Sequence, residues 1–365
     1  MLFGIKLIKV RKLACYDSVK NGKIAGLSKF EKYLVIWIGI CIGIGIAISQ
    51  FVPNIAQAID TIKIGTVSIP IGICLFMMMY PAVLNLQASE LKKIKRNPVP
   101  ILLTLVSNWI VAPLVGTFLA GWLLHGNEQL IVAVILLHAS PCTAMVLVWG
   151  YLAGGNQEQN VVNTSINTVT IIFLYAPMVG LLLSLQNVVY HTNIGVDWLG
   201  LLITAAIFIG LPILAGSLSK KILIRRKGEE WFNNVYREAL GKVAIIALLM
   251  TLIILYSLNG NVMLQNPDKL LLVSIPLLIS FPIVLGYNIM MTKLTNLHYK
   301  EAVVTVLIGS SSHFEIAIAT AITLYGVGSI AALGTTMGLF WEVPVMLSVV
   351  YLARYLRKRN FWLPS

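Results

Sequence analysis

The chain contains few charged residues. Only 11% of its 365 residues are Asp, Glu, Lys or Arg, whereas 58% are hydrophobic. This composition, with a mean hydropathy of +0.86, excludes the surface of an ordinary soluble protein. We therefore interpret the chain as an integral membrane protein, and its net charge of +13 as a guide to membrane orientation rather than a sign of nucleic-acid binding.

Cysteine is also scarce. Cys41, Cys74 and Cys142 fall within hydrophobic runs, and Cys15 precedes the first run. This distribution excludes a disulfide framework and a spaced zinc site. The chain also lacks a G-x-x-x-x-G-K-[ST] loop, so we expect any ATPase that energises it to be another chain.

Hydrophobic runs long enough to span a membrane recur along the whole chain. A spanning helix needs about 20 predominantly apolar residues. The predicted spans are 32–52, 67–87, 99–124, 130–150, 161–186, 197–218, 239–259, 270–292, 300–324 and 329–356.

The basic residues lie almost entirely on one side of these ten spans. All but Lys63 and Lys269 of the 27 Lys and Arg residues fall in segments that alternate spans place on the same side as the N-terminus. Because basic loops remain in the cytoplasm, both termini are predicted to be cytoplasmic.

The fourth span contains a helix-breaking interruption. Ser140, Cys142 and Thr143 surround Pro141 inside an otherwise apolar run. Proline frees backbone groups that lipid cannot satisfy, so such a break persists only inside protein or beside a watery cavity. We therefore expect Cys142 to face a substrate path.

A similar pattern returns in the second half of the chain. Pro113 and Pro282 have nearly the same separation as Pro177 and Pro344, and the break in the fourth span aligns with 310–315 in the ninth. The predicted fold is therefore an all-α membrane protein of ten transmembrane helices in two inverted five-helix repeats. The repeats cover about 32–190 and 197–356, and helices 4 and 9 are discontinuous and cross at the binding site.

Two acidic residues, Glu315 and Glu342, lie well inside predicted spans. Ionisable groups are costly in a membrane, which makes both functional candidates. Glu315 lies in the serine-rich break of the ninth span, where we expect it to exchange protons. Glu342 either shares this role or has a structural one, in which it satisfies freed backbone or pairs with a neighbouring helix. His138 and His313 either relay protons or pack through hydrogen bonds.

The first half of the fifth span carries a face of hydroxyl and amide side chains. Such groups either join helices through hydrogen bonds or line a polar cavity. Within this set Asn167 is the best candidate for a cavity residue.

The stretch Ser140-Pro-Cys-Thr-Ala-Met-Val-Leu-Val-Trp149 resembles the signature of the arsenite-efflux permeases, or arsenical-resistance transporters. These belong to the bile acid/arsenite/riboflavin transporter superfamily. The resemblance covers about 29–358, and makes 29–365 the transporter domain and 1–28 a basic extension, either disordered or on the membrane surface. Further matches occur in the same order at Lys29–Leu34, Pro70–Gly72, Met78–Pro81, Asn108–Trp109, Phe314–Glu315 and Glu342–Leu347.

The resemblance implies a ten-helix antiporter of the cell membrane that exports trivalent arsenic against proton entry without a bound cofactor. It also implies that Cys142 is the essential thiol and Glu315 the essential glutamate. Thiol chemistry agrees with this role, because arsenite is mostly neutral at neutral pH and As(III) is thiophilic. A single thiol also permits release, whereas three thiols would hold As(III) too tightly, so Cys41 and Cys74 are expected to pack.

The resulting hypothesis places As(III) on Cys142, with Ser140, Ser311 and Asn167 around it and Glu315 as the proton-coupling residue. The expected partners are arsenite, protons and membrane lipid, with no nucleic acid. Antimonite as a further cargo and homo-oligomerisation stay open. Supporting roles are assigned to Pro141, Thr143, Phe314, His313 and Glu342.

Three alternatives remain. A sodium-coupled carrier of an organic anion on the same fold would not need Cys142. A passive arsenite channel would leave Glu315 without a coupling role. An intramembrane enzyme with Cys142 as nucleophile and His138 as base would turn over substrate without net transport, but Pro141 lies between the two residues and no orienting carboxylate is evident.

Overall fold

The computed structural model describes residues 34–52, 61, 63–64, 67–84, 98–143, 145–326 and 328–364. This part is almost wholly helical, as expected for apolar runs that must satisfy their own backbone hydrogen bonds in lipid. A single antiparallel pair joins β1 (Lys63–Ile64) to β2 (Val67–Ser68). The expected basic extension, 1–28, lies outside the described residues.

Helix occurs within every one of the ten predicted spans. Three of the helical stretches contain a π-helical turn, marked η. In chain order the elements are α3 (Leu34–Phe51), α5 (Ile69–Leu84), α7 (Val99–Val106), η2 (Ser107–Val111), α8 (Ala112–Leu123), α9 (Glu128–His138), α10 (Met145–Leu152), α11 (Gln157–Tyr190), α12 (Trp198–Ala205), η3 (Ala206–Gly210), α13 (Leu211–Lys227), α14 (Glu229–Trp231), η4 (Phe232–Tyr236), α15 (Arg237–Gln265), α16 (Pro267–Leu294), α17 (Tyr299–Gly309), α18 (Phe314–Tyr325) and α19 (Ile330–Lys358).

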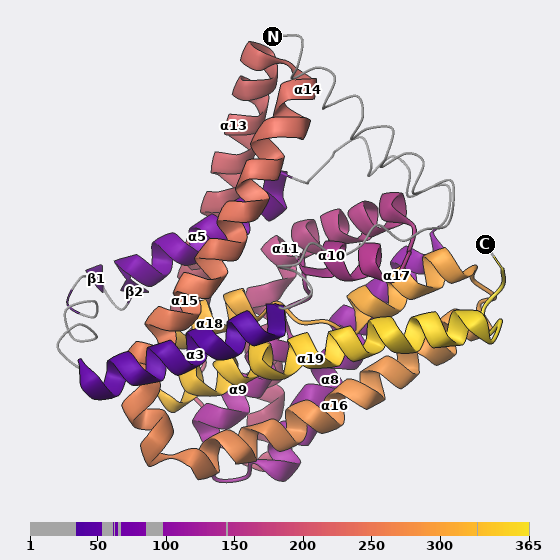
Figure 1. Cartoon of the computed structure of the whole chain (residues 1–365). Helices are drawn as coiled ribbons and strands as arrows, with labels where there is room; N and C mark the ends of the chain where they lie inside the picture. The colour runs from indigo at the N-terminus through magenta and orange to yellow at the C-terminus, as the bar shows by residue number, and fades with distance from the viewer. Residues whose placement is uncertain are drawn as a thin grey trace.

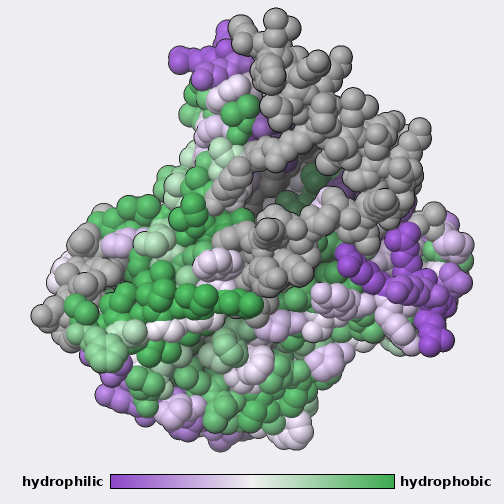
Figure 2. Space-filling model, viewed as in Figure 1, coloured by the Kyte–Doolittle hydropathy of each residue, from purple (hydrophilic) through white to green (hydrophobic). Residues whose placement is uncertain are grey.

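The length and composition of these helices fit a membrane protein. Within the described ranges, six helical stretches are long and apolar enough to cross a membrane, and four shorter apolar helices accompany them. Large hydrophobic side chains are exposed on the outside, including Phe118, Phe173 and Leu271, and hydrophobic residues cover much of the face seen in Figure 2. Such a surface is unsuited to water and suited to lipid.

The helices pack in two groups (Figure 1). In the first group, α15 runs along α3 and α5, and α13 also packs against α5. In the second group, α16 packs against α8, and α19 packs against α9 and α18. Both interrupted helices belong to the second group, whereas α12 reaches across to contact α11 and α18.

The basic segment expected between the sixth and seventh spans is helical rather than a loop. Helix α13 continues to Lys227, the chain reverses at Gly228 with φ of 83°, and helix resumes at Glu229. Lys, Arg and Glu are good helix formers, and glycine tolerates the positive φ at the reversal. The helices therefore continue beyond the predicted spans 197–218 and 239–259, and Figure 1 shows α13 and α14 projecting beyond the other helices.

Candidate functional site

Two helices are interrupted where the sequence predicts a break. Helix α9 ends at His138 and α10 begins at Met145, while α17 ends at Gly309 and α18 begins at Phe314. Each interruption leaves amide and carbonyl groups without helical partners. Inside a membrane protein those groups need other hydrogen-bond partners.

The two interruptions pair with each other. The amide nitrogen of His313 donates to the carbonyl oxygen of Ser140 over 2.7 Å, and Pro141 lies opposite Ser312 in an isolated antiparallel bridge. The hydroxyl of Ser140 also lies 3.2 Å from the carbonyl oxygen of His313. The crossing is therefore a short piece of sheet-like pairing between two broken helices.

A polar pair from two other helices holds the end of α17. The hydroxyl of Ser107, in η2, donates to the carbonyl oxygen of Gly309 over 2.7 Å. The side-chain amide of Asn288, in α16, donates to Ser107 Oγ over 2.8 Å and lies 3.2 Å from Ser310 Oγ. Sequence reasoning missed Ser107 and Asn288 as site residues, although an amide within the apolar run of α16 was an available signal.

Glu342 accepts hydrogen bonds from the second interruption. Its Oε1 accepts a hydrogen bond from the amide nitrogen of Ser312 over 3.1 Å, and its Oε2 accepts one from Ser312 Oγ over 2.8 Å. The Glu342 side chain lies on α19 and is buried. This carboxylate thus accepts hydrogen bonds from a segment whose backbone has lost its helical partners. Ser312 is a further site residue, which the sequence analysis did not single out.

Glu315 lies beside a histidine of the same break, and the two form an ion pair when the imidazole is protonated. Its Oε2 lies 2.7 Å from Nδ1 of His313, and both side chains are buried. Although the distance is that of an ion pair, neither ring nitrogen of His313 makes a hydrogen bond among the described residues. Glu315 is in the first turn of α18, where the positive end of the helix dipole favours a negative charge.

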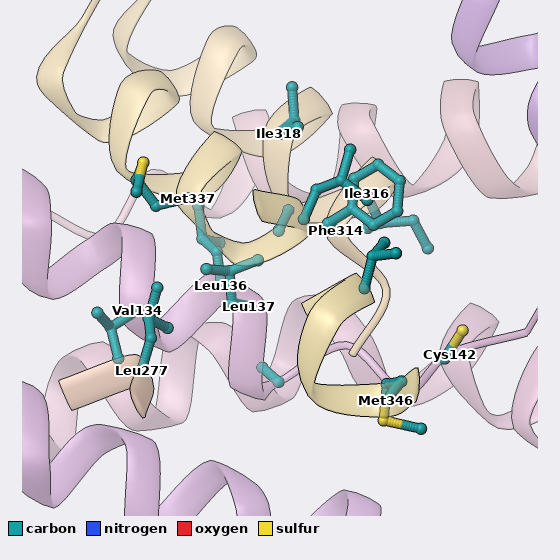
Figure 3. Packing of buried hydrophobic residues seen from close by; sticks show 14 of the residues in the cluster. Val134, Leu136, Leu137, Cys142, Leu277, Phe314, Ile316, Ile318, Met337 and Met346 are labelled. Carbon is teal, nitrogen blue, oxygen red and sulfur yellow. The ribbon is translucent and has the colours of Figure 1, made fainter. Parts of the chain in front are cut away.

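Cys142 and its neighbours lie on the other strand of the crossing. Cys142 is 3% exposed, and Figure 3 shows it on a non-helical stretch in the same apolar cluster as Phe314 and Met346. Its carbonyl oxygen accepts a hydrogen bond from Asn167 Nδ2 over 3.3 Å. Asn167 Oδ1 and Thr143 Oγ1 are buried without a partner among the described residues. Both atoms therefore retain unused hydrogen-bonding capacity.

A cavity of about 40 Å³ lies against the crossing. It is large enough for a few water molecules. Asn108 contributes a buried amide nitrogen that has no partner in the described part of the chain. Ser311 and His138 also line the cavity, but Cys142 does not. In this conformation the thiol is therefore packed rather than open to the cavity.

Of the two remaining candidates, Ser311 makes a contact within its own segment, whereas His138 also reaches another helix. Ser311 donates its hydroxyl to the carbonyl oxygen of Ile308 over 3.2 Å. Nδ1 of His138 donates to the carbonyl oxygen of Val134 over 2.8 Å, since a carbonyl can only accept, and Nε2 lies 2.8 Å from Ser280 Oγ. Among the described residues, no three His, Cys, Asp or Glu side chains gather in the manner of a metal site.

Comparison with known proteins places this architecture in a family. Residues 72–266, more than half of the chain, match the model of the Sodium Bile acid symporter family. The chain is 34% identical to the arsenical-resistance protein Acr3 of Alkaliphilus metalliredigens, over 95% of this chain and 97% of that protein. The chain belongs to this family, in its group of arsenite-efflux permeases.

The similarity to two other relatives also covers nearly the whole length of the permease. The permease is 28% identical to the arsenical-resistance protein Acr3 of Corynebacterium glutamicum, over 93% of each chain. It is 38% identical to the uncharacterized transporter slr0944 of Synechocystis sp., over 93% of this chain and 91% of the relative. The permease is therefore a multi-pass transporter of the cell membrane.

Proposed function

We propose that this permease exports arsenite from the cytoplasm in exchange for protons and so confers arsenic resistance. The observation that carries the proposal is the composition of the crossing. One interrupted helix contributes a buried thiol, Cys142, and the other contributes a buried carboxylate and imidazole, Glu315 and His313. The Acr3 proteins of Alkaliphilus and Corynebacterium, both named arsenical-resistance proteins, support arsenite as the cargo.

The thiol supplies selectivity for a substrate that carries no charge. When arsenious acid binds, a sulfur–arsenic bond replaces one arsenic–hydroxyl bond, and the thiol proton leaves with that hydroxyl as water. Attack by water on arsenic reverses the step and regenerates the thiol. Because a single thiol makes a single bond to arsenic, binding stays reversible on the time scale of transport.

The groups around Cys142 fit the two remaining hydroxyls of bound arsenic. Asn167 Oδ1 is a buried acceptor, and Thr143 Oγ1 can donate or accept. Ser140 and Ser311 belong to the two crossing segments and present hydroxyls near the ends of the half-helices. In this proposal Pro141 and Phe314 shape the site, since each lies at a point where a helix is interrupted.

The Glu315–His313 pair supplies the coupling to protons. A proton entering from outside neutralises Glu315 and removes its attraction to protonated His313. Because the amide nitrogen of His313 also donates to Ser140, a change in this pair is transmitted to the segment that carries Cys142. Protonation thereby favours release of arsenite, and loss of the proton to the cytoplasm resets the site.

The proposed transport cycle uses the two helix groups as moving bodies. The ten spans form two inverted repeats, supported by the matched interruptions in α9–α10 and α17–α18. The group of α3, α5, α12, α13 and α15 rocks against the group that contains the crossing, and both chain termini face the cytoplasm. Rocking exposes Cys142, buried here, to one side of the membrane at a time.

Sodium-coupled transport of an organic anion is the second candidate. It is favoured by the family description and by 28% identity to the uncharacterized sodium-dependent transporter YocS of Bacillus subtilis, which covers 50% of this chain. A cysteine enzyme is less consistent with the site. Both ring nitrogens of His138, its required base, are directed at Val134 and Ser280.

The deciding experiment is As(III) uptake into everted membrane vesicles under an imposed inside-acidic proton gradient or an imposed sodium gradient. The proposal predicts uphill As(III) accumulation that requires the proton gradient. Accumulation of As(III) that requires the sodium gradient would show sodium coupling, as in the second candidate, instead of proton coupling. Absence of As(III) accumulation under either gradient would contradict the proposed cargo.

A further inference from the structure

The residues after α19 fold back onto the turn between α16 and α17. Asn360 adopts a φ of 51°, which redirects the chain. The indole nitrogen of Trp362 then donates to Thr292 Oγ1 over 3.1 Å, and the amide nitrogen of Tyr299 donates to the carbonyl oxygen of Leu363 over 3.0 Å. Trp362 is almost completely buried. The C-terminal segment is therefore built into the fold.

This folding back forms a surface pocket of about 170 Å³, in which Tyr299 and Trp362 are buried and the other lining residues are exposed. Its walls combine a guanidinium, a phenol ring and an amide with apolar side chains of the C-terminal segment. Because the segment is fixed by Trp362 and Leu363, the pocket exists before any ligand binds. The residues that line it are Tyr299, Arg357, Asn360, Trp362, Leu363 and Pro364.

Arg357 gives the pocket its charge. Its guanidinium lies over the ring of Tyr299, 4.9 Å from the ring centre, and a Cβ placed at Gly154 would lie 3.7 Å from its Nη1. Within the described part of the chain, no carboxylate forms an ion pair with Arg357. A guanidinium that lies over an aromatic ring still has N–H donors that can bind an oxyanion.

The surroundings increase the positive potential. Lys293, Lys300 and Lys358 lie on the ends of α16, α17 and α19, whereas Glu301 in the same turns and Glu158 in the first turn of α11 are the acidic residues of this region. Hydrophilic residues gather where α19 ends in Figure 2. Excess basic charge of this kind attracts phosphate groups, and the planar guanidinium matches their geometry.

The apolar residues beside the pocket indicate where the phosphate comes from. Phe361 and Trp362 stack edge to face with ring centres 5.0 Å apart, and Tyr355 is exposed on the last turns of α19. Aromatic residues next to basic ones mark the level of lipid headgroups. We propose that this pocket binds a phosphate group, and that an anionic phospholipid of the adjoining leaflet supplies it.

The site links lipid to the crossing. Tyr299 is the first residue of α17, whose other end is Gly309 at the interruption. The phenol of Tyr299 also donates to the carbonyl oxygen of Ala153, just after α10, over 2.6 Å. A bound headgroup therefore stabilises the outer ends of both half-helices against the end of α19.

The test measures the lipid-dependent shift in the thermal midpoint of the purified full-length permease in neutral detergent. Phosphatidylglycerol, phosphatidylcholine and inorganic phosphate are each titrated against wild type, Arg357→Gln, Arg357→Lys and Arg359→Gln. Arg359 is a matched control, because it lies on the same helix end over the ring of Tyr355 and does not line the pocket. The readout is the shift produced by lipid, so a loss of intrinsic stability in a variant does not affect it.

We expect phosphatidylglycerol, but not phosphatidylcholine, to stabilise the wild type. Its apparent affinity should fall about tenfold in Arg357→Gln, as for the loss of one charge-assisted hydrogen bond, and change by no more than about twofold in Arg359→Gln. Arg357→Lys should be intermediate, because it keeps the charge and loses the planar fork. Equal losses in Arg357→Gln and Arg359→Gln would overturn the pocket as the site. Stabilisation by inorganic phosphate that depends on Arg357, with no added effect of phosphatidylglycerol, would overturn lipid as the source.

Discussion

The amide nitrogen of His313 donates to the carbonyl oxygen of Ser140 over 2.7 Å, across residues far apart in the sequence. This bond ties the chain segment that contains Cys142 to the segment that contains Glu315. The two proposed functions, binding arsenic and binding a proton, therefore belong to one hydrogen-bonded unit. Four variants test how this unit is held and what it does.

Ser107→Ala should weaken the support of α17. The substitution leaves the carbonyl oxygen of Gly309 without the Ser107 hydroxyl and removes an acceptor for Asn288. The expected loss in the free energy of unfolding is about 1–3 kcal/mol, measured by denaturation in detergent. Ser184→Ala is the control, because Ser184 bonds only within its own helix, to Gly180. An equal effect of both substitutions would show that Ser107 has no special role at the crossing.

Glu342→Ala should destabilise the crossing more than Ser312→Ala does. Removing the carboxylate leaves both the amide and the hydroxyl of Ser312 without a hydrogen-bond acceptor, whereas Ser312→Ala removes only the hydroxyl. The predicted difference in unfolding free energy is about 1–2 kcal/mol. If Ser312→Ala has the larger effect, Glu342 does not satisfy the interrupted backbone.

Gly338→Ala should disturb the contact between α19 and α9. A Cβ at Gly338 would clash with the side chain of Leu137, whereas a Cβ at Gly286 would meet nothing within 4 Å. Overpacking of this kind costs about 1–3 kcal/mol. Thermal unfolding should show a lower midpoint for Gly338→Ala and an unchanged or higher midpoint for Gly286→Ala, because alanine favours helix. An unchanged midpoint for Gly338→Ala would contradict the prediction, because it would show that Leu137 moves aside at little cost in stability.

Glu315→Gln should separate arsenite binding from proton coupling. The amide keeps the size of the side chain but carries neither the charge nor the titrating proton. As(III) should still protect Cys142 from alkylation in this variant, while uphill uptake by everted vesicles should be lost across the pH range. Wild-type uptake and pH dependence in Glu315→Gln would remove Glu315 from the coupling mechanism.

Hydropathy and local pattern predict much of this fold. The eighth predicted span, 270–292, falls within α16 (Pro267–Leu294), because about 20 apolar residues leave few other choices in a membrane. Pro141 and the serines near 311 predict the two interruptions from local sequence alone, because proline and clustered polar residues interrupt an apolar helix. The helical reversal at Gly228 was missed, because a charged segment of that composition is equally compatible with a loop.

The partners at the site depend on contacts that sequence spacing does not reveal. Glu342 and Ser312 are brought together by the packing of α19 on α18, and His138 meets Ser280 only because α16 lies nearby. The cluster of three hydroxyl and amide groups at Ser107, Asn288 and Ser310 has the same origin. Single polar residues in apolar spans indicate that some contact exists, but the fold selects the partner.

The most direct test of the account compares Cys142→Ser with Cys41→Ser in proton-gradient-driven As(III) uptake by everted vesicles. Both cysteines are buried in the hydrophobic core, but only Cys142 lies between the interrupted half-helices α9 and α10. The account predicts uptake reduced to background in Cys142→Ser and near wild-type uptake in Cys41→Ser, at equal amounts of protein in the membrane. Substantial gradient-driven uptake by Cys142→Ser would contradict it.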